Sequence, residues 1–513
     1  MNEPSQLGVG GVKASPRVAV VGGGISGLSA AHRLIELLPN ARLTLFETSA
    51  RLGGVLDTFH RDGFLIERSA DNFLTKTPWA VELCQRLGMV DELLPTDETR
   101  RRALVLRDGA LVPIPDGFFL MSPRKLMPLL RSPILSWHGK LRLLIEPLVP
   151  RGHAWESGML AERAAGTDES VASFARRRLG REAFERLVQP LVSGVYTADP
   201  EKLSMAAALP EFFGYERQYG SLLRATLLGH SSSCRQKDAE QGALAGGAPR
   251  SKSAEEGGGS GARYGLFVAP REGMSSLVAA LANRLPNGTI RPGAVVQSVR
   301  QIANGLWRLE FLAGEQELFD ALIVAVPAQA AAKILAPCDS ALSSELAGIH
   351  YAGCAVVSLA LPIQNIGRPL DGFGFVVPII EGRRIIAASF ASEKFPGRAP
   401  ADFALIRVFI GGALQPELAE LPDDALGRLA IEEIGPILQI SGEPLWVDIA
   451  RCPQSMPQYH VGHIARVDRI ERLTAQLPGL ELAGNAYHGV GIPQCVRSGE
   501  AAAERIAARY SSI

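Results

Sequence analysis

Hydrophobic residues in this chain gather in short uninterrupted runs, separated by glycine-rich turns and by segments with helical spacing. The run Arg17–Val21 is apolar and β-branched, which is typical of a buried parallel strand. Apolar residues then recur at helical spacing over 28–38, and a second strand follows over 42–46, so the pattern predicts a βαβ unit. Two further buried strands of the same sheet are expected at 321–326 and 480–483.

The segments between these strands predict a second domain. An apolar run over 104–112 is interrupted by Asp108-Gly109, which favours a hairpin with a tight primed turn. Residues 231–263 are rich in Gly, Ser, Ala and charge and lack apolar periodicity, which predicts a disordered loop. At 513 residues, the chain has room for about three domains or two large interleaved ones.

Composition narrows the class of protein. The 53 basic and 53 acidic side chains balance, which argues against a nucleic-acid binder because such a protein needs a basic excess. Six cysteines without a CxxC pair fit neither a disulfide scaffold nor a zinc site, and they favour a reducing cytosol. Residues 1–16 match neither a secretory signal nor a transit peptide, and we expect no transmembrane helix.

One segment departs from this neutrality. Between Arg100 and Arg151 there are ten basic and three acidic residues, interleaved with bulky apolar side chains. This mixture suits a segment that lies among lipid headgroups, or one that lines a pocket for an apolar anion. An ordinary helical subdomain with a solvated basic face has the same composition, so composition alone leaves both interpretations open.

A glycine motif carries the clearest chemical signal. Gly22-x-Gly24-x-x-Gly27 follows the first strand and opens a helix, and Glu47 stands twenty residues beyond Gly27. The three glycines suit a tight turn, a close approach of the backbone to a pyrophosphate, and close packing of helix on strand. The helix N-terminus offers N–H groups to phosphates, and Glu47 can accept hydrogen bonds from a ribose. The motif therefore predicts a dinucleotide site, against the alternative of a glycine-rich turn without a ligand.

A second glycine pair indicates which dinucleotide is bound. In Arg51-Leu-Gly-Gly54, which closely follows Glu47, the chain resembles FAD oxidoreductases such as amine oxidases, phytoene desaturases and protoporphyrinogen oxidases. Other segments resemble the oxygen-dependent protoporphyrinogen oxidase family and its sister branch, the coproporphyrinogen III oxidases. These segments are 168–180, 193–200, 203–205, 457–463 and 484–495, within a resemblance that covers 17–508 apart from the 231–263 loop.

The resemblance implies an α/β fold of the FAD-binding, amine-oxidase-like Rossmann type. An interleaved α+β substrate domain and a mostly helical subdomain for membrane or substrate binding complete it. We expect FAD-binding segments at 17–75, 264–335 and 461–513, and substrate regions at 76–230 and 336–460, the first of which includes the membrane-binding part.

For the cofactor, the resemblance implies contacts from both glycine turns, an acidic residue, an adenine-facing backbone and the C-terminal strand-to-helix turn. The residues implied are Gly22, Gly23, Gly24, Ile25, Ser26, Gly27, Glu47, Arg51, Gly54, Val55, Val296, Asn485, Val490, Gly491 and Ile492. A helix beginning near Ile492 would point its N-terminus at the flavin ring and stabilise negative charge there.

For the substrate, the resemblance implies a propionate-binding arginine, because a guanidinium suits a carboxylate. Arg102 is the candidate, with Arg100 and Arg101 as close competitors, and Gly194 is implied to approach the macrocycle. Three apolar residues are implied to enclose a pyrrole ring, although each could equally be a core strand residue: Phe373, Val376 and Ile386.

Two features limit the resemblance. The family's Glu-x-Gly-Pro turn is replaced by Glu67-Arg-Ser-Ala70, which leaves the contacts of this turn with the flavin open. His460 and His463 have a spacing that a metal could use, but no third ligand is near in the sequence, so we expect no metal. No histidine or carboxylate stands out as a general base.

The resemblance implies an FAD-dependent oxidase of haem biosynthesis that converts protoporphyrinogen IX to protoporphyrin IX, with O2 as acceptor and H2O2 as product. Coproporphyrinogen III is the alternative substrate. A flavin- or porphyrin-binding carrier without turnover is an alternative of another class, and an amine oxidase or carotenoid desaturase is a weaker one. We expect a cytoplasmic protein on the inner face of the cell membrane. A homodimer and a hand-off of the product to a chelatase are compatible with this, and the sequence decides neither.

Overall fold

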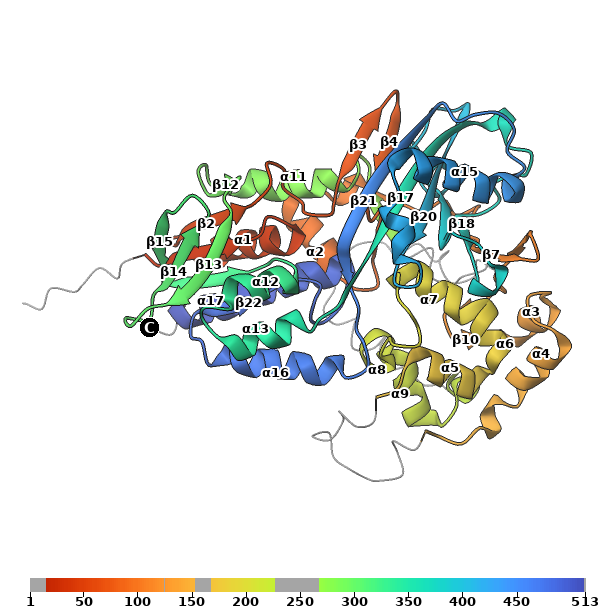
Figure 1. The fold of residues 1–513 in the computed structure, drawn as a ribbon, viewed down its shortest axis with the longest axis horizontal. Helices are drawn as coiled ribbons and strands as arrows, with labels where there is room; N and C mark the ends of the chain where they lie inside the picture. The colour runs from red at the N-terminus through yellow and green to blue at the C-terminus, as the bar shows by residue number, and fades with distance from the viewer. Residues whose placement is uncertain (1–14, 124, 153–167, 227–266, 512–513) are drawn as a thin grey trace, which may run out of the picture.

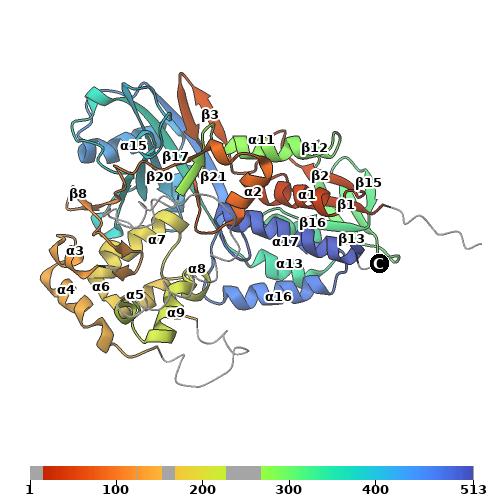
Figure 2. The same cartoon turned by 180° about the vertical axis from the view of Figure 1, so that it is seen from behind.

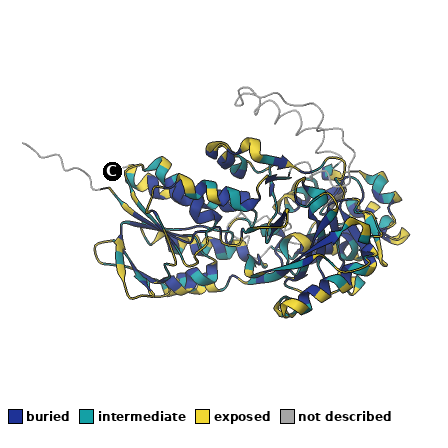
Figure 3. Cartoon of the chain, turned by 90° about the horizontal axis from the view of Figure 1, so that it is seen from above, coloured by how far each residue is buried: buried dark blue, intermediate teal, exposed yellow. Residues whose placement is uncertain are grey.

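The computed structural model describes residues 15–123, 125–152, 168–226 and 267–511, and the loop expected at 231–263 lies outside them (Figure 1). A five-stranded sheet and a helical subdomain occupy opposite ends of the molecule, and a seven-stranded sheet lies beside the helices (Figures 1 and 2). Buried residues concentrate inside these layers and exposed ones on their outer faces (Figure 3). A bilayer-crossing helix is not found among the described residues.

The five-stranded sheet is parallel and combines segments that are far apart in the sequence. Its order is β12 (Ile290–Pro292), β2 (Arg42–Glu47), β1 (Arg17–Val21), β16 (Ala321–Val324) and β22 (Leu480–Leu482). The four strands expected from the sequence are confirmed, and β12 joins them at the edge. The central strands β1 and β16 are apolar on both faces because both faces are covered.

Helices cover one face of the five-stranded sheet, and a smaller sheet with helices covers the other. On the first face, the core of α1 (Ile25–Leu37) is continuous with α2 (Trp79–Leu87), α11 (Met274–Arg284) and α17 (Ile492–Ser511). The second core joins the antiparallel strands β13 (Val296–Gln301), β14 (Trp307–Phe311) and β15 (Gln316–Phe319) to α12 (Ala328–Leu335), α13 (Ser340–Ala347) and α16 (His463–Ala475). Alternate strand residues enter each core, as a pleated strand requires.

The seven-stranded sheet is mixed and carries α15 (Asp423–Leu438) on one face. Its order is β21 (Trp446–Pro457), β17 (Tyr351–Pro362), β20 (Phe403–Gly411), β19 (Ala387–Phe390), β18 (Gly374–Val376), β7 (Leu104–Arg107) and β8 (Ala110–Pro113). The expected hairpin is confirmed as β7–β8, with Asp108 at φ 49° and Gly109 at φ 76°, as a primed turn demands.

Three small ladders connect the larger layers. The hairpin of β3 (Thr58–Arg61) and β4 (Phe64–Glu67) packs against the seven-stranded sheet, in a core shared with β17, β20 and β21. The strands β5 (Phe73–Leu74), β11 (Phe267–Pro270) and β6 (Leu93–Pro95) form a second ladder. The third pairs β9 (Phe118–Phe119) with β10 (Ser122–Pro123). A short helix, α14 (Ala391–Lys394), follows β19.

The helical subdomain is held by a buried ionic cluster. Arg178 donates to Glu216 at 2.7 Å and pairs with Glu146 at 3.3 Å, and all three side chains are fully buried. The subdomain consists of α3 (Leu126–Arg131), α4 (Trp137–Leu144), the short turn Glu146–Leu148, α5 (Val171–Leu179), α6 (Arg181–Ala183), the π-helical turn Phe184–Val188, α7 (Gln189–Tyr196), α8 (Met205–Ala208) and α9 (Pro210–Tyr219). Each charge in the cluster has a partner, which burial of a charge requires.

Candidate functional site

The first glycine turn joins β1 to α1. Of its three motif glycines, two are packed tightly against the backbone and one has open space beside it. A β-carbon at Gly27 would lie 1.9 Å from the carbonyl oxygen of Gly22, and one at Gly22 would lie 2.5 Å from that of Ala325. At Gly24, by contrast, no atom lies within 4 Å of a β-carbon position. Gly22 and Gly27 therefore serve packing, and the Gly24 backbone is open to a ligand, as the motif predicts.

The N-terminus of α1 faces the same opening. Gly24 is its N-cap residue, and no described side chain accepts a hydrogen bond from the first turn. Ile25 and Ser26 begin the helix with buried side chains, so their backbone N–H groups are what they can offer. Unpaired N–H groups and the positive end of the helix dipole suit a pyrophosphate.

Glu47 ends β2 beside this turn. One carboxylate oxygen accepts the N–H of Gly23 at 2.7 Å, and the other accepts that of Ser49 at 2.8 Å. The carboxylate is therefore held in place by the turn itself, where a ribose next to the pyrophosphate would lie. The start of β13 touches the same strand end, because Ala294 N–H donates to the Glu47 carbonyl at 2.9 Å. Val296 follows with a buried side chain, so only its backbone can meet an adenine.

The second glycine turn lies directly against the first. Gly53 N–H donates to the Gly23 carbonyl at 2.8 Å, and a β-carbon at Gly54 would lie 3.4 Å from Gly24 Cα. Arg51 shapes this turn, because its guanidinium donates to the carbonyls of Leu52, Gly54 and Leu56 at 2.6–3.0 Å. Val55 then stands 52% exposed. The two turns thus form one continuous glycine surface.

The C-terminal turn is held by a tyrosine that the sequence interpretation did not single out. The Tyr459 hydroxyl donates to the Asn485 carbonyl and accepts the N–H of Gly489 at 2.8 Å, and its ring stacks on His463 at 3.9 Å. Asn485 also donates to the Ser455 carbonyl at 3.2 Å. The helix expected near Ile492 is confirmed as α17, which begins at that residue.

The residues ahead of α17 leave its N-terminus accessible. Val490 and Gly491 are only half-buried, and the Gly491 carbonyl accepts the N–H of Cys495 at 3.0 Å as the first helical bond. A ring system placed beside Val490 would therefore meet the positive end of a 20-residue helix.

His460 and His463 contact neighbouring side chains and backbone of the fold. His463 Nε2 lies 3.2 Å from the Tyr487 carbonyl oxygen, and burial lowers the pKa of His463 to about 4, so the ring is neutral. His460 lies against His350, with ring centroids 5.1 Å apart. Within the described ranges, no group of three His, Cys, Asp or Glu residues could hold a metal ion.

Three of the residues expected at the substrate gather where α7 meets the seven-stranded sheet. A β-carbon at Gly194 would lie 3.1 Å from Val376 Cγ1. Ile386 Cδ1 and the Thr197 carbonyl oxygen both lie close to Gly412, at 2.9 and 3.2 Å from a β-carbon position there. The end of α7 is therefore wedged against β18 and the start of β19. The same end reaches the C-terminal turn, because Gln458, next to Tyr459, donates to the Tyr196 carbonyl at 3.4 Å.

Phe373 and Arg102 form a second pair at this sheet. Phe373 is buried, and its N–H donates to the Arg102 carbonyl at 2.8 Å, which makes it a core residue beside the arginine. The Arg102 guanidinium pairs with Asp371 at 2.8 Å and stays 51% exposed. Arg100 pairs with Glu393, and Arg101 pairs with Glu98 at 2.8 Å.

The turn that departs from the family pattern is anchored by an ionic cluster that sequence reasoning missed. Arg407, buried in β20, donates to the Ser69 carbonyl and pairs with Asp71 at 3.2 Å, and Lys394 pairs with Asp71 at 3.0 Å. Burial alone would raise the pKa of Asp71, but Lys394 and Arg407 lower it to about 2. The available signal was a single arginine in the otherwise apolar run of β20.

Glu67, at the start of the same turn, is a buried carboxyl with neutral partners. It accepts the N–H of Met274 at 2.7 Å and the hydroxyl of Thr58 at 2.9 Å. Burial raises the pKa of Glu67 to about 7, and these hydrogen bonds and two arginines only partly offset that effect.

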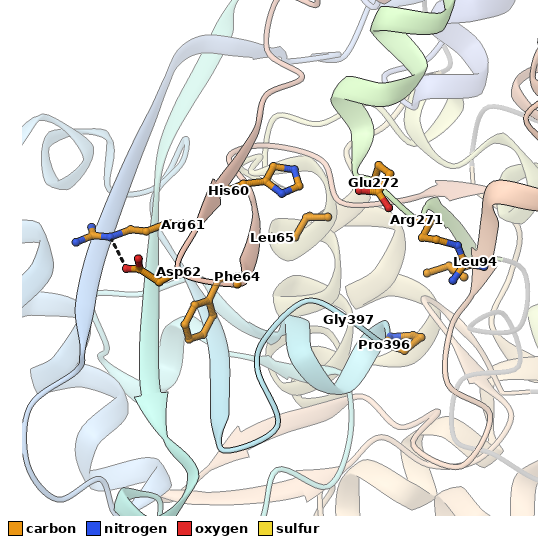
Figure 4. A pocket seen from close by; sticks show the side chains of 11 residues that line it. His60, Arg61, Asp62, Phe64, Leu65, Leu94, Arg271, Glu272, Pro396 and Gly397 are labelled. Carbon is orange, nitrogen blue, oxygen red and sulfur yellow. Dashed lines mark hydrogen bonds and ion pairs between the residues drawn. The ribbon is translucent and has the colours of Figure 1, made fainter.

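A pocket of about 640 Å³ opens between the β3–β4 hairpin and the 396–397 segment (Figure 4). Its lining mixes charges, with Arg61 paired to Asp62 at its rim and Glu272 beside Arg271 across it. None of its lining residues is among the residues expected to bind cofactor or substrate. The pocket therefore lies outside the candidate site.

A parallel sheet with two adjoining glycine turns, an open helix N-terminus and an acidic residue at the neighbouring strand end defines a dinucleotide-binding protein. The chain belongs to the flavin containing amine oxidoreductase family, whose sequence model matches residues 25–507. FAD is therefore its cofactor, and the site fits it: Gly24 is open, α1 is uncapped by any described side chain, and Glu47 is held in place. The contacts of individual residues with FAD remain predictions.

Relatives within the family extend over nearly the whole chain. The coproporphyrinogen III oxidase of Bacillus subtilis (strain 168) is 30% identical over 490 residues, 94% of this chain and 96% of that protein. Protoporphyrinogen oxidase 2, chloroplastic/mitochondrial, of Arabidopsis thaliana is 28% identical over 504 residues, 96% of this chain and 93% of that protein. These similarities confirm the resemblance drawn from the sequence.

Solved structures agree on the fold. A crystal structure from Exiguobacterium sp. 255-15, provisionally named a protoporphyrinogen oxidase, superposes with a TM-score of 0.79 at 28% identity, covering 96% of this chain and 99% of that one. Cyclohexylamine oxidase from Brevibacterium oxydans IH-35A superposes with a TM-score of 0.65 at 16% identity, covering 97% of this chain and 100% of that one, which supports the fold alone. The expected amine-oxidase-like FAD-binding fold is confirmed.

Proposed function

We propose that this protein is an FAD-dependent oxidase of a porphyrinogen, with protoporphyrinogen IX as its first candidate substrate and O2 as the acceptor. The observation that carries the proposal is the packing of Gly194 against Val376, next to the turn held by Tyr459. This packing supports a macrocycle site that adjoins the flavin site. The end-to-end similarity to porphyrinogen oxidases of both kinds supports the same chemistry.

In this proposal the chain positions the substrate and the cofactor does the oxidation. When bound, FAD supplies two-electron oxidation of a C–H centre and passes the electrons to O2. Arg102 holds a propionate at the edge of the seven-stranded sheet, and Val376 and Ile386 contact an apolar ring face. The N-terminus of α17 favours negative charge on the ring system beside it. Holding the reacting carbon close to the cofactor is the protein's main contribution.

Coproporphyrinogen III is the second candidate. The relatives from Bacillus subtilis, Propionibacterium freudenreichii and Staphylococcus aureus, at 29–32% identity, are named coproporphyrinogen III oxidases. This substrate carries four propionates where protoporphyrinogen IX carries two. Of Arg100, Arg101 and Arg102, Arg102 is the arginine that is exposed together with its acidic partner. A single arginine that can exchange its partner suits the substrate with fewer carboxylates.

The test is an aerobic porphyrin-fluorescence assay of the purified holoenzyme with protoporphyrinogen IX and coproporphyrinogen III in parallel. Faster turnover of the first supports the proposal, and faster turnover of the second supports the alternative. No signal above spontaneous oxidation, with FAD bound and reducible by dithionite, would overturn both and favour a carrier.

A matched pair of variants tests the role of Arg102. Arg102→Gln should raise KM about fivefold with little change in kcat, because an exposed ion pair to a propionate contributes about 1 kcal/mol. Arg101→Gln is the control, since that arginine pairs with Glu98 beside it in the sequence. Equal effects of the two substitutions would remove Arg102 from the substrate site.

We also propose that the helical subdomain rests on a membrane surface. Trp137 and Leu148 are 74% and 79% exposed, and Met127 and Leu141 are exposed on the neighbouring turns. They lie on α3, α4 and the turn that follows, at the end of the molecule farthest from the five-stranded sheet (Figure 1). Exposed Arg131 adds positive charge, a combination typical of interfacial helices. Sedimentation with anionic liposomes at low salt tests this, and absence of binding would contradict it.

A further inference from the structure

Two cysteines face each other in the seven-stranded sheet. Cys354 in β17 and Cys452 in β21 are direct partners across an antiparallel ladder. Directly opposed residues in such a ladder have Cα atoms about 4.5–5.5 Å apart. That separation lies inside the range of about 4.4–6.8 Å that a disulfide spans. The backbone pairing therefore holds the two residues at a separation that a disulfide can span.

The ladder is irregular directly beside the pair. The pairing of the two strands shifts by two residues between Ala352 and Cys354, and a β-carbon at Gly353 would lie 3.0 Å from the Cys452 carbonyl oxygen. Such a bulge increases the local twist of two paired strands. Neither residue is fully buried, which the entry of a small oxidant requires.

The two cysteines lie on the face of the sheet that meets the Glu67–Ala70 turn, away from the core under α15. Alternate residues of β17, Ala355 and Val357, enter the core under α15, so Cys354 lies on the opposite face. On that face, the Cys452 thiol donates to the Arg68 carbonyl at 3.6 Å. The next carbonyl in that turn, that of Ser69, is the acceptor of Arg407. The two thiols thus adjoin the Glu67–Ala70 turn.

The surroundings shift the pKa values of the two thiols in opposite directions. A hydrogen bond from Cys354 and the charge of Arg407 lower the pKa of Cys452, against the effect of burial. Burial raises the pKa of Cys84 to about 12 and that of Cys495 to about 11. Because the thiolate is the nucleophile, Cys452 is the described cysteine set up to react first.

We propose that Cys354 and Cys452 form a dithiol that hydrogen peroxide oxidises reversibly to a disulfide. The Cys452 thiolate attacks one peroxide oxygen, the O–O bond breaks, and a sulfenic acid and hydroxide form. The Cys354 sulfur then attacks the sulfenic sulfur and displaces water. Two thiols and one H2O2 give one disulfide and two waters. The reaction needs only peroxide from any source. That the protein itself produces this peroxide rests on the proposed function.

The test applies peroxide to the reduced, full-length holoenzyme, followed by alkylation of free thiols and peptide mass spectrometry. We expect a peptide pair joined through Cys354 and Cys452 that dithiothreitol separates, formed before Cys84 or Cys495 is modified. Cys354→Ser should stop the cross-link and leave a sulfenic acid at Cys452 that dimedone traps. Cys338→Ser, outside the pair, should leave the cross-link unchanged.

Two results would overturn the dithiol. One is full alkylation of both cysteines after peroxide treatment, and the other is a sulfinic acid at Cys452 without any disulfide. A second arm replaces added peroxide by aerobic turnover of a porphyrinogen. A cross-link with added peroxide but no porphyrin formation supports the dithiol and counts against the proposed function alone, so the two failures are distinguishable.

Discussion

Replacing Gly24 by alanine adds a β-carbon where no atom lies within 4 Å, at φ −73° and ψ 176°, a backbone conformation that any residue adopts. The apoprotein should therefore fold as before, with a free energy of unfolding unchanged or raised by up to about 1 kcal/mol. The methyl group occupies the space through which a pyrophosphate approaches the backbone. One excess methyl in a close contact costs about 1–3 kcal/mol. FAD should therefore bind about 5- to 150-fold more weakly.

Gly27 supplies the matched comparison. A β-carbon there would lie 1.9 Å from the Gly22 carbonyl oxygen, so Gly27→Ala must push α1 away from β1. This variant should lose about 1–3 kcal/mol of unfolding free energy in addition to its FAD affinity. Titration of each apoprotein with FAD, followed by flavin fluorescence, and urea unfolding of the same preparations separate the two effects. If Gly24→Ala binds FAD as the wild type does, or loses as much stability as Gly27→Ala, the assignment of Gly24 to the cofactor is wrong.

Three further predictions concern stability and membrane binding. Arg178→Ala leaves buried Glu146 without its arginine partner and buried Glu216 with Arg177 alone, and should lower the unfolding free energy by about 3–5 kcal/mol in urea titrations. A loss below about 1 kcal/mol would contradict this. Glu67 has a pKa of about 7 in the fold against an ordinary 4.5, so its stabilising contribution is complete below pH 4.5 and is lost as pH rises toward 7. Glu67→Gln should therefore gain roughly 3 kcal/mol relative to the wild type between those pH values, and a pH-independent difference would refute the shift. The double variant Trp137→Ala, Leu141→Ala should bind anionic liposomes at least about tenfold more weakly with unchanged porphyrinogen turnover in detergent, and unchanged sedimentation would exclude this surface.

The sequence predicted those parts of the site whose signals are local. The strand Arg17–Val21, the glycine motif behind it and the helix starting at Ile492 are each encoded within a few neighbouring residues. The periodicity of apolar residues and the placement of glycine report such structure directly. The Asp108-Gly109 turn was predictable for the same reason.

The residues that sequence reasoning missed act across long separations. Arg407 reaches the Ser69 carbonyl over 338 residues of chain, and Tyr459 holds a turn 30 residues away at Gly489. The residues beside Arg407 in the sequence do not indicate which residue it pairs with. A single charge in an apolar strand indicates only that a partner must exist. The composition overestimates the unpaired positive charge of the basic segment. Arg100, Arg101 and Arg102 each pair with an acidic residue outside that segment, and composition cannot show such pairs.

The strand order β12-β2-β1-β16-β22 has a consequence for synthesis on the ribosome. The strand β1 emerges some 300 residues before its neighbour β16, whose register partner for Val18 is Ala321. The last partner, β22, and the helix that closes on α1 through Gly499 emerge later still. Pairings of such high contact order form slowly, and apolar strands stay exposed meanwhile. The cofactor site is thus assembled only after most of the polypeptide has been made, and a chain that stops before β22 carries the glycine motif without a completed sheet to bind FAD.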